Sequence, residues 1–347
     1  EVIHSSLVST IRSSSRFERE HENGVSHFLE HMLFKGTKTR SSQDIAEAFD
    51  RIGGQVNAFT AKEYTCIYAN IAIDILADMF FNSVFDEEEI QKEKKVVYEE
   101  IKMVDDTPDD VVHDLLSKAS FGKHPLAKPI LGTVAHLETF TKETLFSYMN
   151  RFYTGDRIVI SIAGNVSEAM IEKLQKTFSA VTPTTVPYHE KKPEFVSKVI
   201  VRQKETEQAH LCLGFPGLAL GSKDGYALVL LNNLLGGTMS SRLFQEIREN
   251  KGLCYSVFSY HSSFQDIGML TIYAGTAHEQ LDDLVAAILH TVGTLSEKGI
   301  TEKELILAKE QLKGNLMLSL ESTSSRMTRN GKNELLLKKH RTLDETI

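Results

Sequence analysis

The spacing of apolar residues along the chain predicts where helices form. The segment SHFLEHMLF, residues 26–34, repeats apolar side chains every three or four positions, and Gly36 follows it as a helix stop. The same period recurs in three further segments, which are 42–52, 70–81 and 87–104. We expect a helix over each of these ranges.

Two other stretches have the composition of strands. Residues 55–69, QVNAFTAKEYTCIYA, alternate and are rich in Thr, Tyr and Val. Residues 158–163, IVISIA, form a continuous apolar run that ends at Gly164, which is typical of a buried strand. Helices and strands in this mixture predict an α+β fold.

A proline-rich stretch divides the chain. Residues 182–194, TPTTVPYHEKKPE, hold three prolines and a cluster of charges, and they form the best linker in the sequence. The chain has 347 residues, more than one compact core usually holds and enough for two. We therefore expect an N-terminal domain over residues 1–187 and a C-terminal domain over residues 195–347.

The two predicted domains resemble each other. Residues 24–37 run parallel to residues 225–238, and residues 85–90 run parallel to residues 300–305. In this register five His and Glu side chains of the first copy have no counterpart in the second. His27, Glu30, His31, Glu93 and Glu100 align with Leu228, Leu231, Asn232, Ala308 and Asn315, in that order. We expect two duplicated α+β domains, each a mostly antiparallel sheet with helices packed on one face, of which only the first carries these His and Glu side chains.

The first predicted helix carries the sequence H-x-x-E-H. His27 and His31 are one turn apart on the same side of the helix, so both imidazoles can reach one metal ion. Glu30 lies on the same broad face and can contact a water molecule on that metal without being a ligand. Two imidazoles and one carboxylate leave zinc an open fourth position, as in hydrolytic sites. The alternative is that both histidines are ordinary surface or core residues, because three matched positions also arise by chance.

The third ligand is expected on the helix over residues 87–104. Glu93 and Glu100 are seven residues apart and therefore share a face of that helix. One carboxylate could complete the ligand set, and the other could orient a ligand from outside it. By spacing alone, Glu100 is no better a candidate than Glu99 and Glu93 together. The alternative interpretation of these glutamates is a solvated acidic helix face.

Charge, hydropathy and cysteine content indicate no nucleic acid or membrane partner and favour a cytoplasmic location. The formal net charge of −8 at pH 7 offers no basic field for phosphates, so we expect no nucleic acid partner. No apolar run is long enough to cross a bilayer, so we expect no membrane. Cys66, Cys212 and Cys254 are odd in number and widely spaced, which favours a reducing, cytoplasmic setting. The sequence starts at Glu1, which leaves open a targeting segment ahead of it.

At these motifs the sequence resembles the pitrilysin or insulinase family of zinc peptidases, which carry the H-x-x-E-H order. The resemblance runs through several stretches, which are residues 16–18, 24–37, 53–60 and 93–101, then 241–244 and 248–255. The size of the chain resembles the short, two-domain branch of the family. That branch includes bacterial processing-protease-like enzymes and the catalytic subunit of the mitochondrial processing peptidase.

The resemblance implies a role for each residue of the metal constellation. His27, His31 and Glu100 match the zinc ligands, so one zinc ion per chain is expected. Glu30 matches the general base that helps zinc-activated water attack the scissile carbonyl. Glu93 matches a supporting carboxylate near the site.

The resemblance also implies residues that contact the substrate. Phe34 matches an apolar residue lining the cleft, and Asn57 and Ala58 match a strand edge that pairs with the substrate backbone. Arg248 and Tyr255 match a pair in the second domain that contacts the substrate, with Tyr255 placed to stabilise the oxyanion. From the sequence alone, Arg248 would be interpreted as a surface ion-pair partner and Tyr255 as an aromatic residue at the edge of the core.

These expectations describe a zinc metallo-endopeptidase. It would hydrolyse extended or unfolded peptides in a chamber that the chain closes with a partner of the same shape. Because both halves of the expected site lie in one chain, a homodimer is the simpler expectation. Two alternatives stay open: a non-catalytic scaffold relative, and a catalytic subunit that needs a separate glycine-rich partner. An intact H-x-x-E-H motif speaks against the scaffold.

Overall fold

The computed structural model describes residues 5–51, 53–54, 56–70, 73–184 and 192–347. The chain divides into two compact units, each built from separate pieces of sequence. The first comprises Glu1–Met103, Lys128–Glu190 and Leu318–Ile347, and the second comprises Val104–Ala127 and Lys191–Met317. This division differs from a single cut at the expected linker, of which residues 185–191 lie outside the described residues.

The first unit is built on a sheet with the strand order β2-β3-β1-β4. β1 (Ser5–Ile11) runs antiparallel to β3 (Thr65–Asn70) on one side and to β4 (Ile158–Gly164) on the other. β2 (Val56–Thr60) pairs with β3 alone, again antiparallel. β2 is therefore an edge strand of this sheet.

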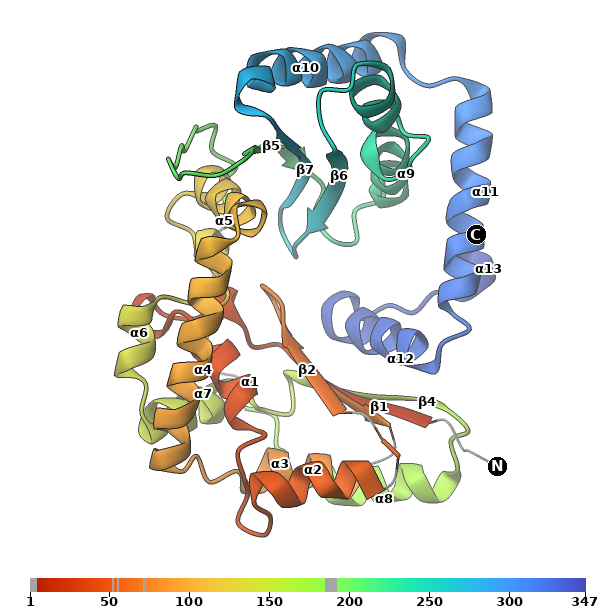
Figure 1. The fold of residues 1–347 in the computed structure, drawn as a ribbon. Coiled ribbons are helices and arrows are strands. Elements are labelled where there is room, and N and C mark those ends of the chain that lie inside the picture. Colours follow the sequence, from red (N-terminus) through yellow and green to blue (C-terminus); the bar gives the residue numbers. More distant parts are fainter. Residues whose placement is uncertain (1–4, 52, 55, 71–72, 185–191) are drawn as a thin grey trace. The chain divides into compact units, whose positions relative to one another are not determined.

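Helices cover both faces of this sheet (Figure 1). The main hydrophobic core packs one face against the helices α1 (Val25–Met32), α2 (Ser42–Arg51), α3 (Ile73–Asn82), α4 (Glu87–Asp106), α6 (Val134–Thr139), α7 (Lys142–Phe152) and α8 (Glu168–Phe178). α12 (Thr323–Lys332) lies on the opposite face, over β1 and β4, where its Met327 is fully buried. A helix from the far end of the sequence thus completes the first unit.

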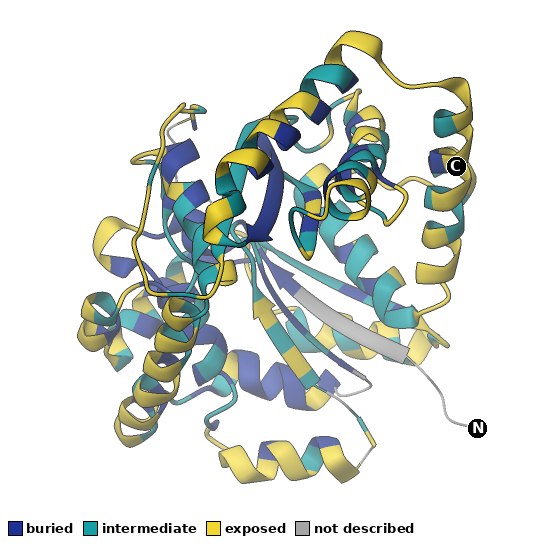
Figure 2. Ribbon diagram, turned by 45° about the horizontal axis from the view of Figure 1, so that its top comes forward, coloured by how far each residue is buried: buried dark blue, intermediate teal, exposed yellow. Residues whose placement is uncertain are grey.

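The second unit has a three-stranded antiparallel sheet in the order β5-β7-β6. These strands are β5 (Ala209–Gly217), β6 (Ser256–Ser263) and β7 (Gly268–Thr276). β7 is buried along its whole length (Figure 2). One core of this unit includes residues of α9 (Gly225–Gly236) and α10 (Leu281–Lys298), and a second core joins the sheet to α5 (Pro108–Phe121).

The two units repeat one order of elements. The strand order β2-β3-β1 in the first unit corresponds to β6-β7-β5 in the second. The helix pair α4 and α5 corresponds to α11 (Glu302–Ser319) and α12, and the second helix of each pair packs on the sheet of the other half of the sequence. The predicted α+β class with two similar halves is confirmed. The expectation of helices on one face is incomplete, because α5 and α12 cover the other.

The remaining described elements are short. They are the single turns η1 (Ser15–Phe17), η2 (Glu20–Glu22), η3 (Pro125–Ala127) and η5 (His278–Gln280), the π-helical segments η4 (Phe244–Asn250) and η6 (Asn333–Leu337), and α13 (Leu343–Thr346). None of the helices in the described ranges has the length and hydropathy that a bilayer crossing requires.

One predicted boundary differs from the observed one because of long-range strand pairing. The helix expected over residues 70–81 begins at Ile73, because the Asn70 backbone pairs with Ser6 as the last residue of β3. A local pattern does not contain that partner, which lies more than sixty residues earlier. Ile52 and Gln55, at the ends of two other predicted elements, lie outside the described residues.

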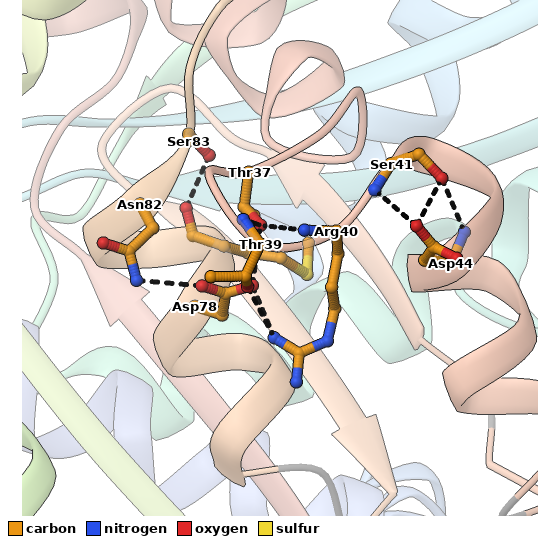
Figure 3. A network of polar contacts seen from close by, with 9 residues as sticks. Thr37, Thr39, Arg40, Ser41, Asp44, Asp78, Asn82 and Ser83 are labelled. Carbon is orange, nitrogen blue, oxygen red and sulfur yellow. Dashed lines mark hydrogen bonds and ion pairs between the residues drawn. The ribbon is translucent and has the colours of Figure 1, made fainter.

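The turn that follows α1 is tied to α3 by one carboxylate (Figure 3). Asp78 is 7% exposed and accepts hydrogen bonds from Thr37 Oγ1 at 2.7 Å, Thr39 Oγ1 at 2.8 Å and Asn82 Nδ2 at 2.8 Å. Arg40 Nη1 adds an ion pair at 2.5 Å. Burial by itself raises the pKa of Asp78, but these hydrogen bonds outweigh it and lower that pKa to about 2. The ionised carboxylate therefore fixes the chain just after α1.

We expect Asp78→Asn to lower the free energy of unfolding at pH 7 by about 2–3 kcal/mol. The folded pKa lies below the unfolded value of 3.8, so this stabilisation is complete above pH 3.8 and is lost as the pH falls towards 2. Chemical denaturation of both proteins between pH 7 and pH 2.5 should show the difference shrinking on the acid side.

Asp74 of the same helix provides the matched control, because its side chain is 65% exposed and pairs with Lys173 at the surface. Asp74→Asn should change the free energy of unfolding by less than about 0.5 kcal/mol. An equal loss in both variants, or a pH-independent loss in Asp78→Asn, would contradict the assignment.

Candidate metal centre

The sequence of α1 sorts its side chains onto two faces. Its apolar residues recur every three or four positions and are fully buried; they are Val25, Phe28, Leu29 and Met32. His27, Glu30 and His31 fall between them and line a cleft of about 590 Å³. The spacing that places the apolar residues of α1 in the core therefore also places His27, Glu30 and His31 at the cleft.

A buried carboxylate fixes the N-terminus of α1. Glu18 is 3% exposed, and its two oxygens accept from the backbone N–H groups of Gly24 at 2.8 Å and Ser26 at 2.9 Å. Ser26 Oγ and Asn23 Nδ2 donate to it as well, at 2.5 Å and 3.2 Å. Burial raises the pKa of Glu18, and these bonds partly offset that rise. A negative group satisfies helix N–H donors and suits the positive end of the helix dipole.

Three donor atoms converge at the cleft. Glu100 Oε2, from α4, lies 3.7 Å from His27 Nε2 and 3.6 Å from His31 Nε2. Within the described part of the chain, these residues form the one group of three His, Cys, Asp or Glu side chains whose donor atoms could hold a metal ion. Glu99 points elsewhere, because its side chain is 70% exposed and pairs with Lys102.

The spacing of these atoms fits a zinc ion. Ligand atoms about 2.1 Å from a tetrahedral zinc ion lie roughly 3.4 Å from one another, close to the observed 3.6 and 3.7 Å. Glu100 Oε2 is buried and has no hydrogen-bond partner among the residues that the structure describes. A buried carboxylate oxygen without a donor is costly, and a cation would compensate it. Two imidazoles and one carboxylate are also donors that zinc accepts.

Glu93 contacts His31 on the ring nitrogen that does not face Glu100. Its Oε1 is 2.8 Å from His31 Nδ1, and its Oε2 is 2.6 Å from Lys35 Nζ. An Nδ1–H bond to a carboxylate leaves Nε2 unprotonated and free to bind a metal, the usual arrangement of a ligand histidine. Burial raises the pKa of Glu93, but its bonds to His31 and Lys35 outweigh burial and lower it.

Glu30 lies beside these candidate ligands without belonging to the group of three. Its side chain is 8% exposed, and Thr60 Oγ1 of β2 donates a hydrogen bond to its Oε2. Burial raises the pKa of Glu30, and the bond from Thr60 only partly offsets this. A carboxyl with a raised pKa beside a metal site is suited to accepting and releasing a proton.

The cleft contains every substrate residue predicted in the first half, and several that were not predicted. Phe34 lines it, as do Asn57 and Ala58 on the edge strand β2. The Ala58 N–H donates to Asn57 Oδ1 at 2.8 Å, not to β3, so it lies at the free edge. The lining residues that sequence reasoning missed are Lys35, Phe59, Thr60, Ile130 and Leu131.

A close backbone contact brings Ile130 and Leu131 to the cleft. Gly132 follows them with a φ of 74°, and a Cβ added there would lie 2.3 Å from the carbonyl oxygen of Asn23. Only glycine fits such an approach. The Gly-Thr pair after these residues was the available sequence signal, but its partner is more than a hundred residues away.

The structure brings Arg248 and Tyr255 together in the second unit. Arg248 Nε donates to the Tyr255 carbonyl oxygen at 3.0 Å, and the guanidinium lies 5.4 Å from the centre of the Tyr255 ring. Tyr255 is 80% exposed. The two residues therefore contact each other, and the Tyr255 side chain is exposed.

Comparison with known families gives matches over most of the chain. Residues 4–134 match the family described as insulinase, peptidase family M16. Residues 139–312 match the peptidase M16 inactive domain. The metal-site residues all lie in the first match, and Arg248 and Tyr255 lie in the second.

Relatives of known sequence support the same family. The uncharacterized zinc protease YmxG of Bacillus subtilis is 60% identical over 344 residues, covering 97% of this chain and 84% of that protein. An uncharacterized zinc protease of Streptomyces coelicolor is 39% identical over 349 residues, covering 96% of this chain and 76% of that protein.

Solved structures share the fold. A protease from Helicobacter pylori superposes with a TM-score of 0.90 at 22% identity, over 96% of this chain and 84% of that one. A peptidase M16 inactive domain from Pseudomonas fluorescens gives 0.85 at 21% identity, over 97% and 84%.

The two histidines should differ in proton affinity when no metal is bound. Burial and the neighbouring His31 lower the pKa of His27 to about 3. Burial also lowers the pKa of His31, but the hydrogen bond that its ring donates to Glu93 and the charges of the nearby carboxylates outweigh burial and raise that pKa above 6.5. In chelated protein at pH 6, ¹⁵N-histidine NMR should show His27 neutral and His31 protonated.

The NMR signals of the two histidines would be assigned with the variants His27→Gln and His31→Gln, each of which removes the signal of one histidine. Two imidazoles that titrate together near the ordinary histidine pKa of about 6.5 would contradict this electrostatic description.

Proposed function

The chain belongs to the insulinase family of peptidases, family M16, and from this premise we propose that it is a zinc metallo-endopeptidase acting on extended or unfolded peptides. Family membership supports a metalloprotease, and close relatives are named zinc proteases. The observation that carries the proposal is the convergence of His27, His31 and Glu100, with Glu30 beside them.

We assign the ligands and their support as follows. His27 Nε2, His31 Nε2 and Glu100 Oε2 would hold one zinc ion per chain. Bound zinc would supply Lewis acidity, which acidifies water and polarises a peptide carbonyl. Glu93 keeps the His31 proton on Nδ1 and so presents Nε2 to the metal. Lys35 neutralises the remaining charge of Glu93.

Glu30 carries the proton transfers in this proposal. It removes a proton from the attacking water and returns it to the leaving amine, so that one carboxylate serves as base and then as acid. Its raised pKa favours the second step, because a more basic carboxylate holds the proton until the amine accepts it.

The edge strand β2 would bind the substrate backbone. Asn57 and Ala58 lie at the free edge and line the cleft, so an extended peptide could add to the sheet as a further strand. Such binding needs no particular side chain and requires an unfolded segment. Phe34 would contact an apolar substrate side chain, and Arg248 and Tyr255 would contact the substrate from the second unit, with Tyr255 near the oxyanion.

We propose that the chain forms a homodimer that closes a chamber around the site. Both the donor set and the Arg248–Tyr255 pair belong to one chain, so no separate catalytic partner is required. The cytoplasmic location expected from the cysteines stays a prediction; Cys66, Cys212 and Cys254 are unpaired in the structure.

Glu30→Gln should abolish cleavage while zinc stays bound. Loss of a general acid–base lowers kcat by about 10²–10⁴-fold, whereas the amide removes no ligand. Quenched fluorescent peptide libraries would report cleavage, and atomic absorption would report zinc near one per chain in both proteins.

The wild-type chain, purified alone, should lose cleavage with a chelator and regain it with zinc. Cleavage by Glu30→Gln at the wild-type rate would contradict the role of Glu30. Cleavage by wild type that survives complete removal of zinc would contradict a metal mechanism. An inactive wild-type chain that gains activity with another protein would favour the subunit alternative.

Glu100→Gln should weaken zinc binding more than Glu93→Gln does. Losing a residue that only supports a ligand typically lowers metal affinity about 10–100-fold, so the loss of a ligand should exceed that range. Competition with a chromophoric chelator would measure both dissociation constants.

Glu99→Gln is the matched control, since Glu99 is adjacent to Glu100 and exposed. It should leave zinc affinity within about two-fold of wild type. A loss of affinity in Glu99→Gln as large as in Glu100→Gln would reverse the assignment of the third ligand.

A further inference from the structure

We propose that Thr60 is a positioning residue for the reaction, and that its hydroxyl holds the Glu30 carboxylate beside the metal ligands but out of the ligand set. The inference rests on the proposed function, because it takes Glu30 as the base. Its starting observation is the hydrogen bond from Thr60 Oγ1 to Glu30 Oε2. This bond fixes one carboxylate oxygen and leaves the other for the proton.

Glu30 needs such an anchor because of where it lies. A glutamate side chain has three rotatable bonds, and a carboxylate within reach of a divalent cation is itself a good ligand. Glu30 is next to His31 in sequence, yet among the described residues the metal group consists of His27, His31 and Glu100. The hydrogen bond from Thr60, which does not belong to that group, explains how Glu30 stays near the group without joining it.

Thr60 can act as an anchor because its own position is fixed. It is the last residue of β2 and pairs with Thr65 of β3. Thr60 Oγ1 lies 3.3 Å from Thr65 Oγ1, and Thr65, which is fully buried, donates to the Ser13 carbonyl oxygen at 3.2 Å. A β-branched side chain on a strand also has few rotamers. The hydroxyl is therefore presented in one place before substrate arrives.

The hairpin that follows Thr60 is clamped as well. The Arg16 N–H donates to the Lys62 carbonyl oxygen at 3.0 Å, and Arg16 Nη1 pairs with Glu63 Oε1 at 2.7 Å. Both side chains of that ion pair are almost completely buried, at 0% and 4% exposure. Breaking a buried ion pair costs several kcal/mol of free energy, so this pair keeps the end of β2 in place. The contacts that fix Thr60, and through it Glu30, therefore continue through the hairpin to the buried Arg16.

A purely structural role is the competing explanation. A carboxylate that is 8% exposed needs a donor whatever its function. The two explanations differ in what the loss of the hydroxyl changes. A structural bond affects stability and binding in general, whereas a positioning bond affects the step in which Glu30 moves a proton.

Thr60→Val removes the hydroxyl and keeps the branched shape that suits a strand. We expect kcat to fall about 10–100-fold, with KM within about two-fold of wild type and zinc content unchanged, because misplacement of a reacting group acts on the chemical step. Thr60→Ser restores the hydroxyl and should recover kcat to within about three-fold of wild type. A Thr60→Val enzyme with wild-type kcat would overturn the inference, and so would a Thr60→Ser enzyme as slow as Thr60→Val.

A second readout uses metal-free protein and needs no activity. Thr60→Val should lower the thermal midpoint in the wild-type background and change it by less than about 1 °C in a Glu30→Ala background, because the two residues act through one bond. Equal shifts in both backgrounds would overturn the proposed contact.

The failure of this inference is distinguishable from the failure of the proposed function. A wild-type chain that binds zinc and cleaves no peptide would overturn the proposed function and, with it, the role of Thr60. A wild-type chain that cleaves, beside a Thr60→Val variant that cleaves equally well, would overturn the role of Thr60 alone.

Discussion

The first unit is organised around one constraint: three donor atoms must be held within a few ångström of one another inside a partly buried cleft. Without a cation this arrangement is unfavourable, since no hydrogen-bond donor in the described ranges reaches the buried Glu100 Oε2, and burial disfavours the charged form of His27. The packing of α1 against α4 must therefore supply the free energy that keeps the donors together. Binding of a divalent cation would offset part of this unfavourable free energy.

α1 meets this constraint although it is only eight residues long. A helix of that length is not stable by itself in water, so tertiary contacts must define it. Its buried apolar face anchors its middle, the Glu18 carboxylate satisfies its first N–H groups, and the Asp78 network fixes the turn beyond its end. Each of these contacts comes from a different element, so the positions of His27 and His31 depend on the fold of the whole unit.

The parts of this molecule that were predictable from sequence are those encoded by local period. The spacing of apolar residues in 26–34 predicted α1 and the face that carries the histidines, and the alternation in 55–69 predicted the strands of the cleft. The choice between Glu99 and Glu100 was open, because one residue along a helix changes the direction of a side chain by about 100° and only packing decides which points inward. In the structure Glu100 points to the histidines, and Glu99 pairs with Lys102 at the surface.

What was not predictable depends on partners far apart in sequence. Thr60 ends the stretch 53–60 that resembles the family, but nothing in the local sequence indicates its contact with Glu30, which lies thirty residues earlier. The position of α5 and α12, each on the sheet of the other half of the sequence, also has no local signal, because the sequence of a helix does not contain the sheet that it covers. Duplication of the sequence indicated two similar halves, but not that each half would complete the other.

Anomalous diffraction at the zinc edge, from crystals of the chain purified without added metal, tests the central claim most directly. The difference map should show one strong peak per chain, within about 2.3 Å of His27 Nε2, His31 Nε2 and a Glu100 carboxylate oxygen. A map with no peak between these three atoms after zinc is added, or with its peak at other side chains, would contradict it.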